Sequence, residues 1–138
     1  MPKFAVFVSA SADSEGGKLP STQELTDMTA YNEELVKAGI MLAGEGLKSS
    51  SKGARLNFSA DGASKPEYGP FGLDNLIAGY WLWKLDSLEQ AIEWASKIPF
   101  KEGRVEIRQV MSEEDFGPAL TEELKKKEEE LRKQTGSS

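Results

Sequence analysis

The sequence predicts an α+β fold, and three observations lead to this prediction. Residues 76–85 form the most apolar run of the chain and hold two of its three tryptophans, which suits a central strand. Two stretches, beginning at Ser21 and at Asp86 or Ser87, carry apolar residues at helical spacing. Shorter apolar segments at 3–10, 40–47 and 104–110 flank them, so strands alternate with helices along the chain.

The N-terminal third is predicted to contain a strand, a loop and a helix. Residues 3–10 are apolar on both faces, which is typical of an interior strand. Residues 9–20 are small, polar and glycine-containing, which predicts a mobile loop. The helix begins at Ser21, where Glu24 completes a capping box, and stops at Gly39. Its core face carries Leu25, Met28, Asn32, Leu35 and Val36.

A β-hairpin is predicted between the second strand and the central strand. Residues 54–59 alternate apolar and polar side chains, and Asp61-Gly62 is a strong tight-turn signal. The weaker return arm ends at the Y-G-P-F motif of residues 68–71, where Pro70 forces an irregular backbone. This bend leads into the central strand and is a candidate wall for a pocket.

The C-terminal part of the chain changes character at Ser112. The second helix ends at Pro99 and the last strand covers 104–110, after which Glu and Lys dominate and pair at i,i+4 spacing. We expect a helix from about Pro118 to Lys133, docked by its few leucines. The predicted organisation is therefore a domain over 1–111 and a charged helical extension over 112–138.

The element order predicts a ferredoxin-like βαββαβ sandwich with an inserted hairpin. In this arrangement both helices cover one face of the sheet, and no further apolar helix remains for the other face. We therefore expect a homodimer that packs sheet to sheet and places Trp81, Trp83 or Tyr80 near the interface.

Composition excludes several classes of function. The net charge of −6, from 17 basic and 23 acidic residues, argues against binding to nucleic acid or to an anionic membrane. The chain has no cysteine and no histidine, so it lacks thiolate chemistry, the commonest general base and the commonest transition-metal ligand. No calcium loop, phosphate loop or dinucleotide fingerprint occurs, so we predict neither a metal site nor a cofactor. No signal peptide or membrane span is predicted, so a cytoplasmic protein is expected.

Four motifs stand out over about residues 1–111: A-G-I-M-L-A-G-E-G-L, Y-G-P-F, the run from L-I-A-G-Y-W-L-W-K-L to A-S-K-I-P, and V-E-I-R-Q-V. Together they resemble the YCII-related, DGPF-type domain family. The resemblance implies a dimeric α+β barrel with a cleft between the helix-free sheet faces. Relatives of this fold act on small, often aromatic molecules, and others look regulatory. Tyr68 replaces the aspartate of the family's signature, and the His-Asp pair of one branch cannot exist here.

Two carboxylates are candidates for catalysis. Glu45 lies between two glycines, where the backbone can approach a ligand closely and a partly enclosed carboxylate can act as a base. Asp74, close to the Y-G-P-F bend, is a second candidate. The alternatives are that Glu45 pairs with Arg108 or caps backbone amides, and that Asp74 is a solvated loop residue.

Four residues are candidates for ligand binding. Glu106 and Arg108 share one face of the last strand, and Arg108 is suited to hold a carboxylate in a bidentate manner, unless the two form a structural ion pair. Tyr68 and Phe71 stand at the bend, where turn formation is the alternative role.

Three functional hypotheses follow. The first is a small-molecule-binding or regulatory dimer with the ligand in the cleft between its subunits. The second is a lyase- or isomerase-like enzyme that acts on a small organic acid or aromatic compound with a carboxylate base. The third is an interaction module that docks through its charged C-terminal helix.

Overall fold

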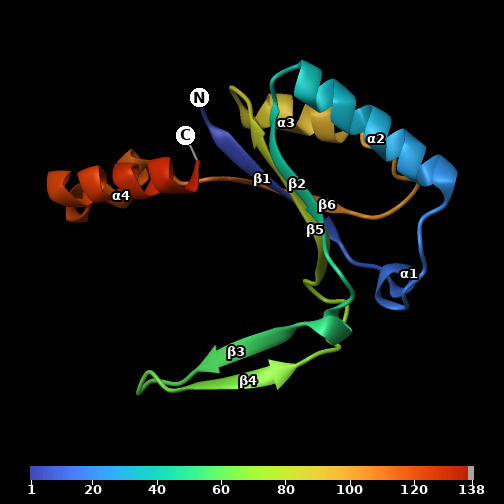
Figure 1. Ribbon diagram of the computed structural model, residues 1–138, viewed down its shortest axis with the longest axis horizontal. Helices are drawn as coiled ribbons and strands as arrows, with labels where there is room; N and C mark the ends of the chain where they lie inside the picture. The colour runs from blue at the N-terminus through green and yellow to red at the C-terminus, as the bar shows by residue number, and fades with distance from the viewer. Residues whose placement is uncertain (137–138) are drawn as a thin grey trace.

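The computed structural model describes residues 1–136 and confirms the ferredoxin-like α+β fold. Strands β1 (Lys3–Ser9), β2 (Met41–Gly46), β5 (Ile77–Lys84) and β6 (Val105–Gln109) form one antiparallel sheet in the order β2-β5-β1-β6. Helices α2 (Thr22–Lys37) and α3 (Leu88–Ala95) cover one face of this sheet (Figure 1). The first strand and the apolar strand near the middle of the sequence are the two interior strands, as predicted.

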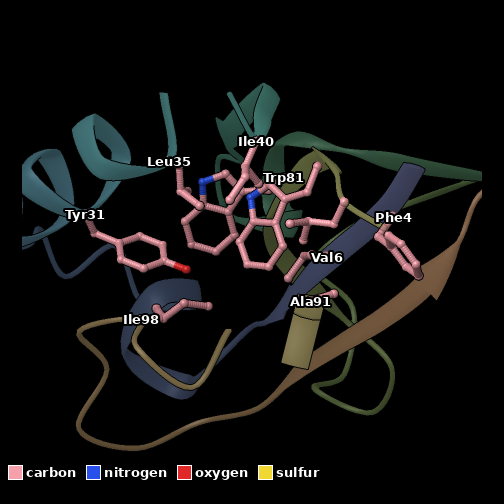
Figure 2. Packing of buried hydrophobic residues seen from close by; sticks show 10 residues of the cluster. Phe4, Val6, Tyr31, Leu35, Ile40, Trp81, Ala91 and Ile98 are labelled. Carbon is pink, nitrogen blue, oxygen red and sulfur yellow. The ribbon is translucent and has the colours of Figure 1, made fainter. Parts of the chain in front are cut away.

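The core lies between the sheet and the two helices. Because side chains alternate along a strand, Phe4 and Val6 of β1 point to the helices, as do Trp81 and Trp83 of β5. Figure 2 shows Trp81 and Val6 among the helical residues Tyr31, Leu35 and Ala91 of the cluster. The buried residues are Phe4, Val6, Tyr31, Leu35, Ile40, Trp81, Trp83, Leu85, Ala91 and Ile98.

The position of the two tryptophans corrects one expectation. Trp81 is 6% exposed and Trp83 is fully buried, so neither indole is available for an interface on the helix-free face. Of the three aromatic residues expected there, only Tyr80 alternates to that face. The two interior strands β1 and β5 carry aromatic side chains on both faces, and the sequence alone did not tell which face the helices cover.

Both helices that cover the sheet begin at the caps that the sequence predicts. Ser21 and Glu24 form the capping box of α2, and the Ser87 side chain caps α3. The two helices are joined by the Tyr31 hydroxyl, which donates to the carbonyl oxygen of Trp94 at 2.7 Å. Burial, with a smaller contribution from the charge of Glu34, raises the pKa of Tyr31 well above its usual value.

Three short helical turns were not predicted. The expected mobile loop over 9–20 contains α1 (Ala12–Glu15), capped by Ser11 and Ser14, and the serine-rich loop contains η1 (Ser50–Lys52). The 3-10 segment η2 (Glu113–Ala119) precedes α4 (Glu122–Thr135), so α4 begins after Thr121 rather than at Pro118. Single turns are too short to show an apolar period, which is why the sequence pattern did not reveal them.

Two elements extend away from the body. The hairpin of β3 (Ala54–Phe58) and β4 (Ser64–Tyr68) forms a separate two-stranded sheet, and its Asp61 accepts a hydrogen bond from Ser59 that lowers the pKa of Asp61. In Figure 1 the hairpin and α4 lie on the side of the main sheet opposite α2 and α3. Leu124 and Leu131 of α4 are 46% and 51% exposed, so the expected docking of this helix by its leucines is wrong for these two residues.

Within residues 1–136, none of the helices combines the length and apolar character that crossing a membrane requires.

Candidate functional site

A cavity of about 250 Å³ lies between α2 and the adjacent strands β2 and β5. Helix α2 contributes Met28 and Asn32, and β5 contributes Trp81. We call this space the Trp81 cavity. Its lining consists of Val8, Met28, Asn32, Gly44, Glu45, Gly46, Ala78, Gly79, Tyr80, Trp81 and Phe100. It is mostly apolar, with few polar groups, which is the usual character of a site for a small organic molecule.

The glycines on either side of Glu45 have different effects. A Cβ atom at Gly44 would lie 2.7 Å from Cδ1 of Trp81, so glycine at this position makes room for the indole. A Cβ atom at Gly46 would meet nothing within 4 Å, and this residue borders the open space of the cavity. Gly79, opposite Gly46, is required because a Cβ atom there would lie 2.9 Å from the carbonyl oxygen of Glu45.

One hydrogen bond fixes the polar side of the cavity. Trp81 Nε1 donates to Asn32 Oδ1 at 3.0 Å, which orients the amide so that its Nδ2 group is the donor left for other partners. The ring of Tyr31 meets the Trp81 indole edge to face, with centroids 5.9 Å apart and an interplanar angle of 71°. The wall formed by Trp81 is therefore held by both a hydrogen bond and ring packing.

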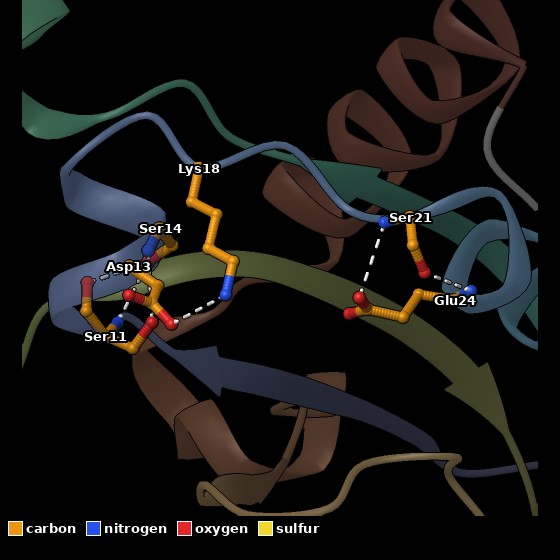
Figure 3. Close-up of polar contacts among 6 residues, drawn as sticks. All are labelled: Ser11, Asp13, Ser14, Lys18, Ser21 and Glu24. Carbon is orange, nitrogen blue, oxygen red and sulfur yellow. Dashed lines mark hydrogen bonds and ion pairs between the residues drawn. The ribbon is translucent and has the colours of Figure 1, made fainter.

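A second, more polar hollow of about 500 Å³ adjoins this cavity and shares Val8, Ala78 and Phe100 with it. Lys18 forms an ion pair with Asp13 at 3.6 Å along its wall (Figure 3). Arg104 and Glu102 also line it. The two spaces form a groove with an apolar end at Trp81 and a charged end at α1.

The backbone turn at the charged end is held by local hydrogen bonds. Ser11 and Ser14 bond each other's backbone amides at the start of α1, and Glu24 accepts from the amide of Ser21 (Figure 3). Because the carboxylate of Glu24 already caps α2, it is held at the wall of the hollow rather than free in solvent.

The structure places Glu45 and Glu106 at opposite ends of one row across the sheet. The strand register gives the order Glu45, Tyr80, Phe7 and Glu106 on the helix-free face. Three strand spacings separate the two carboxylates, about 14 Å. Within one subunit this distance excludes the ion pair between Glu45 and Arg108 that the sequence left open, since Arg108 lies on the same strand as Glu106.

Arg108 and Glu106 pair with each other. The guanidinium lies 3.3 Å from the Glu106 carboxylate, and both side chains are more than half exposed. Glu106 also lines a hollow of about 350 Å³ with Phe7, Ile77 and Arg104, at the end of the helix-free face. Glu45 and Glu106 therefore border two different spaces on the single subunit.

The Y-G-P-F bend does not reach the cavity. Tyr68 is 77% exposed at the end of β4, Asp74 is exposed in the following loop, and Phe71 packs under the guanidinium of Arg55 at 3.9 Å. None of Tyr68, Phe71 and Asp74 lines the Trp81 cavity.

The bend instead anchors the hairpin to the body. The Phe71 amide donates to Ser50 Oγ at 2.9 Å, and both the amide and the hydroxyl of Ser50 donate to the Glu15 carboxylate. A Cβ atom at Gly69 would lie 1.8 Å from the Ser50 carbonyl oxygen, so only glycine fits at this crossing. We call this cluster of Glu15, Ser50, Gly69 and Phe71 the hairpin anchor.

The sequence analysis did not assign Asn32, Met28 or Trp81 to a site. The signal available in the sequence was that Asn32 is the polar member of an otherwise apolar helical stripe, since an amide that becomes partly buried needs a hydrogen-bond partner. The partner, Trp81, is 49 residues away and becomes visible only in the fold.

Metal binding has no support from clustered ligands. In the part of the chain that the structure describes, no group of three or more Asp or Glu side chains is placed to hold a metal ion.

Comparison with known proteins identifies one family. The model of the YCII-related domain matches residues 3–114, which is most of the chain and includes the whole four-stranded sheet. No curated protein matches the chain. From this match and its ferredoxin-like sheet, the chain belongs to the YCII-related domain family.

Proposed function

We propose that the chain is a homodimeric protein that binds a small, neutral aromatic or branched aliphatic molecule in the Trp81 cavity. The observation that carries the proposal is the cavity itself, kept open at Gly46 and walled by an indole that Asn32 holds in place. Its volume of about 250 Å³ lies just below the range of drug-sized pockets, which favours a small metabolite.

The groups around the cavity select the chemistry of the ligand. The Nδ2 group of Asn32 offers one hydrogen-bond donor, which favours a ligand with a carbonyl or hydroxyl oxygen. Among the described residues, the lining includes no basic side chain that could neutralise an anionic ligand. Neutral ligands are therefore favoured over carboxylates at this end of the groove.

The dimer is supported by the surface of the isolated chain. A monomeric globular protein of 15.1 kDa exposes about 7,100 Å², whereas this chain exposes 10480 Å². The excess of about 3,400 Å² is larger than the roughly 800 Å² that each partner buries in a standard-size interface. The helix-free face, with Phe7, Tyr80 and Leu82, is the broad surface on which a second copy packs.

Ligand-observed NMR tests the cavity with indole, benzamide and benzoate as probes. Indole and benzamide should bind the wild type, benzoate should bind more weakly, and Gly46→Val should weaken the neutral probes at least tenfold by filling the space. Gly72→Ala is the matched control, because its Cβ atom meets nothing within 4 Å and lies outside the cavity. Equal binding of the neutral probes to wild type and Gly46→Val would place the ligand site elsewhere.

A lyase- or isomerase-like enzyme is the second candidate, and the position of Glu45 at the cavity rim favours it. In this case the Glu45 carboxylate, which shares the helix-free face with Tyr80, acts as the base toward a molecule bound at the cavity mouth beside Tyr80. A compound that the wild type converts and Glu45→Gln does not, while both bind it equally, would select the enzyme. If the wild type binds the compound without converting it, the chain is a binding protein rather than an enzyme for that compound.

A further inference from the structure

The hairpin of β3 and β4 has one apolar and one polar face. The register pairs Leu56 with Pro66 and Ala54 with Tyr68, so these residues share a face with Phe58. Leu56, Phe58 and Tyr68 are 58%, 72% and 77% exposed. A two-stranded hairpin with an uncovered apolar face is marginal in water, so a partner surface is needed to stabilise it.

The base of the hairpin is fixed, so its direction is set by the fold. The hairpin anchor joins it to α1 through Glu15, and the Gly69 amide donates to the Gly53 carbonyl oxygen at 3.0 Å. Arg55 stacks on Phe71 at the same end. The apolar face is therefore presented at a defined position beyond the main sheet (Figure 1).

A matching hollow lies at the other end of the helix-free face. It has a volume of about 590 Å³ between the sheet and the C-terminal segment, and its apolar walls include Leu82, Val110 and Met111. Val110 and Met111 are 38% and 54% exposed, and Arg132 of α4 closes one side. We call this space the tail hollow.

The two elements leave the sheet at opposite ends. The hairpin follows β2 and precedes β5, whereas the C-terminal segment 112–136, which we call the tail, follows β6. Strands β5 and β6 run parallel to each other because both are antiparallel to β1. Figure 1 shows the hairpin and the tail on the helix-free side. When two such faces meet, a two-fold axis along the strands brings hairpin to hairpin, and an axis across the strands brings hairpin to tail.

Charge distinguishes the two arrangements. Residues 48–68 carry four basic and two acidic side chains, a net charge of +2, in a protein whose net charge is −6. Residues 112–136 carry eight acidic and five basic side chains, a net charge of −3. Hairpin against hairpin sets like charges together, whereas hairpin against tail pairs opposite charges.

We infer that the two subunits exchange their hairpins, so that Leu56 and Phe58 of one copy enter the tail hollow of the other. This inference rests on the proposed dimer and adds its two-fold axis and its contacts. Each hairpin gains a cover for its apolar face, and each tail hollow is filled by the partner. In this arrangement the hairpin of each subunit contacts the C-terminal segment of the other subunit.

Disulfide trapping tests the contact directly, because the chain has no native cysteine. Phe58→Cys and Met111→Cys are made separately, mixed under conditions that exchange subunits, and oxidised. The expected result is a disulfide-linked dimer in the mixture, in larger yield than either variant gives alone. Asn57→Cys in place of Phe58→Cys is the control, because Asn57 lies on the polar face of the hairpin, and its mixture should give little product.

Sedimentation equilibrium supplies a readout that does not need a disulfide. Phe58→Asp should raise the dissociation constant of the dimer at least tenfold, whereas Asn57→Asp should stay within about twofold of the wild type. Strong self-linkage of Phe58→Cys, or a dimer that Phe58→Asp leaves intact, would overturn the exchange and leave the proposed dimer standing. A monomeric wild type would contradict both the hairpin exchange and the proposed dimer.

Discussion

At the scale of single residues, the structure explains why the Y-G-P-F motif has glycine at its second position. The backbone of Gly69 crosses that of Ser50 so closely that a methyl group would lie 1.8 Å from a carbonyl oxygen. The same serine holds the Phe71 amide and the Glu15 carboxylate. The motif in this chain therefore positions the hairpin, and its side chains do not reach the Trp81 cavity.

We expect Gly69→Ala to lower the free energy of unfolding by about 1–3 kcal/mol or more, because the added methyl group forces two backbone segments apart. Urea unfolding followed by tryptophan fluorescence measures the change. Gly72→Ala is the control, since its Cβ atom has open space, and it should stay within about 0.5 kcal/mol of the wild type. Equal stability of the two variants would contradict the close crossing.

At the scale of elements, the sequence predicted the helices and strands with a regular apolar period, but it did not predict the short irregular turns. The apolar stripe through Leu35 and the capping box located α2, and an apolar stripe after the Ser87 cap located α3. The Asp61-Gly62 turn located the hairpin. The turn of α1 and the 3-10 segments are held by local hydrogen bonds rather than by apolar periodicity, so the pattern left them as loops.

The candidate site was less predictable than the fold. Glu45 was selected for its flanking glycines, and it does border the cavity. Asn32 and Trp81 act through a contact between distant segments, which spacing along the chain does not encode. Tyr68, Asp74 and Glu106 were grouped by closeness to a motif or a strand, and the fold distributes them over the hairpin, a loop and the far edge of the sheet.

The two helices α2 and α4 should respond differently to the same substitution. Leu35 of α2 is fully buried, so Leu35→Ala should cost about 2–5 kcal/mol through lost burial and a cavity. Leu124 of α4 is 46% exposed, so Leu124→Ala should change the unfolding free energy by about 0.5 kcal/mol or less. Urea unfolding measures both, and a large cost at Leu124 would show that α4 packs on the core.

At the scale of the whole molecule, the single chain is an open shape. A compact body of four strands and two helices carries a hairpin and a tail that extend beyond a bare sheet face. The surface of 10480 Å² and the exposed apolar residues on both extensions are the surfaces that we propose a second copy covers. The Trp81 indole lies on the opposite, helix-covered side of β5, so the proposed pairing leaves the cavity beside it accessible.

Sedimentation velocity of the purified full chain at micromolar concentration tests the central claim, pairing through the helix-free face, most directly. We predict a species of twice 15.1 kDa that persists on dilution, and a shift toward the single chain in Leu82→Glu, which puts a charge on that face. A wild type that sediments as one 15.1 kDa chain over the whole concentration range would contradict the account.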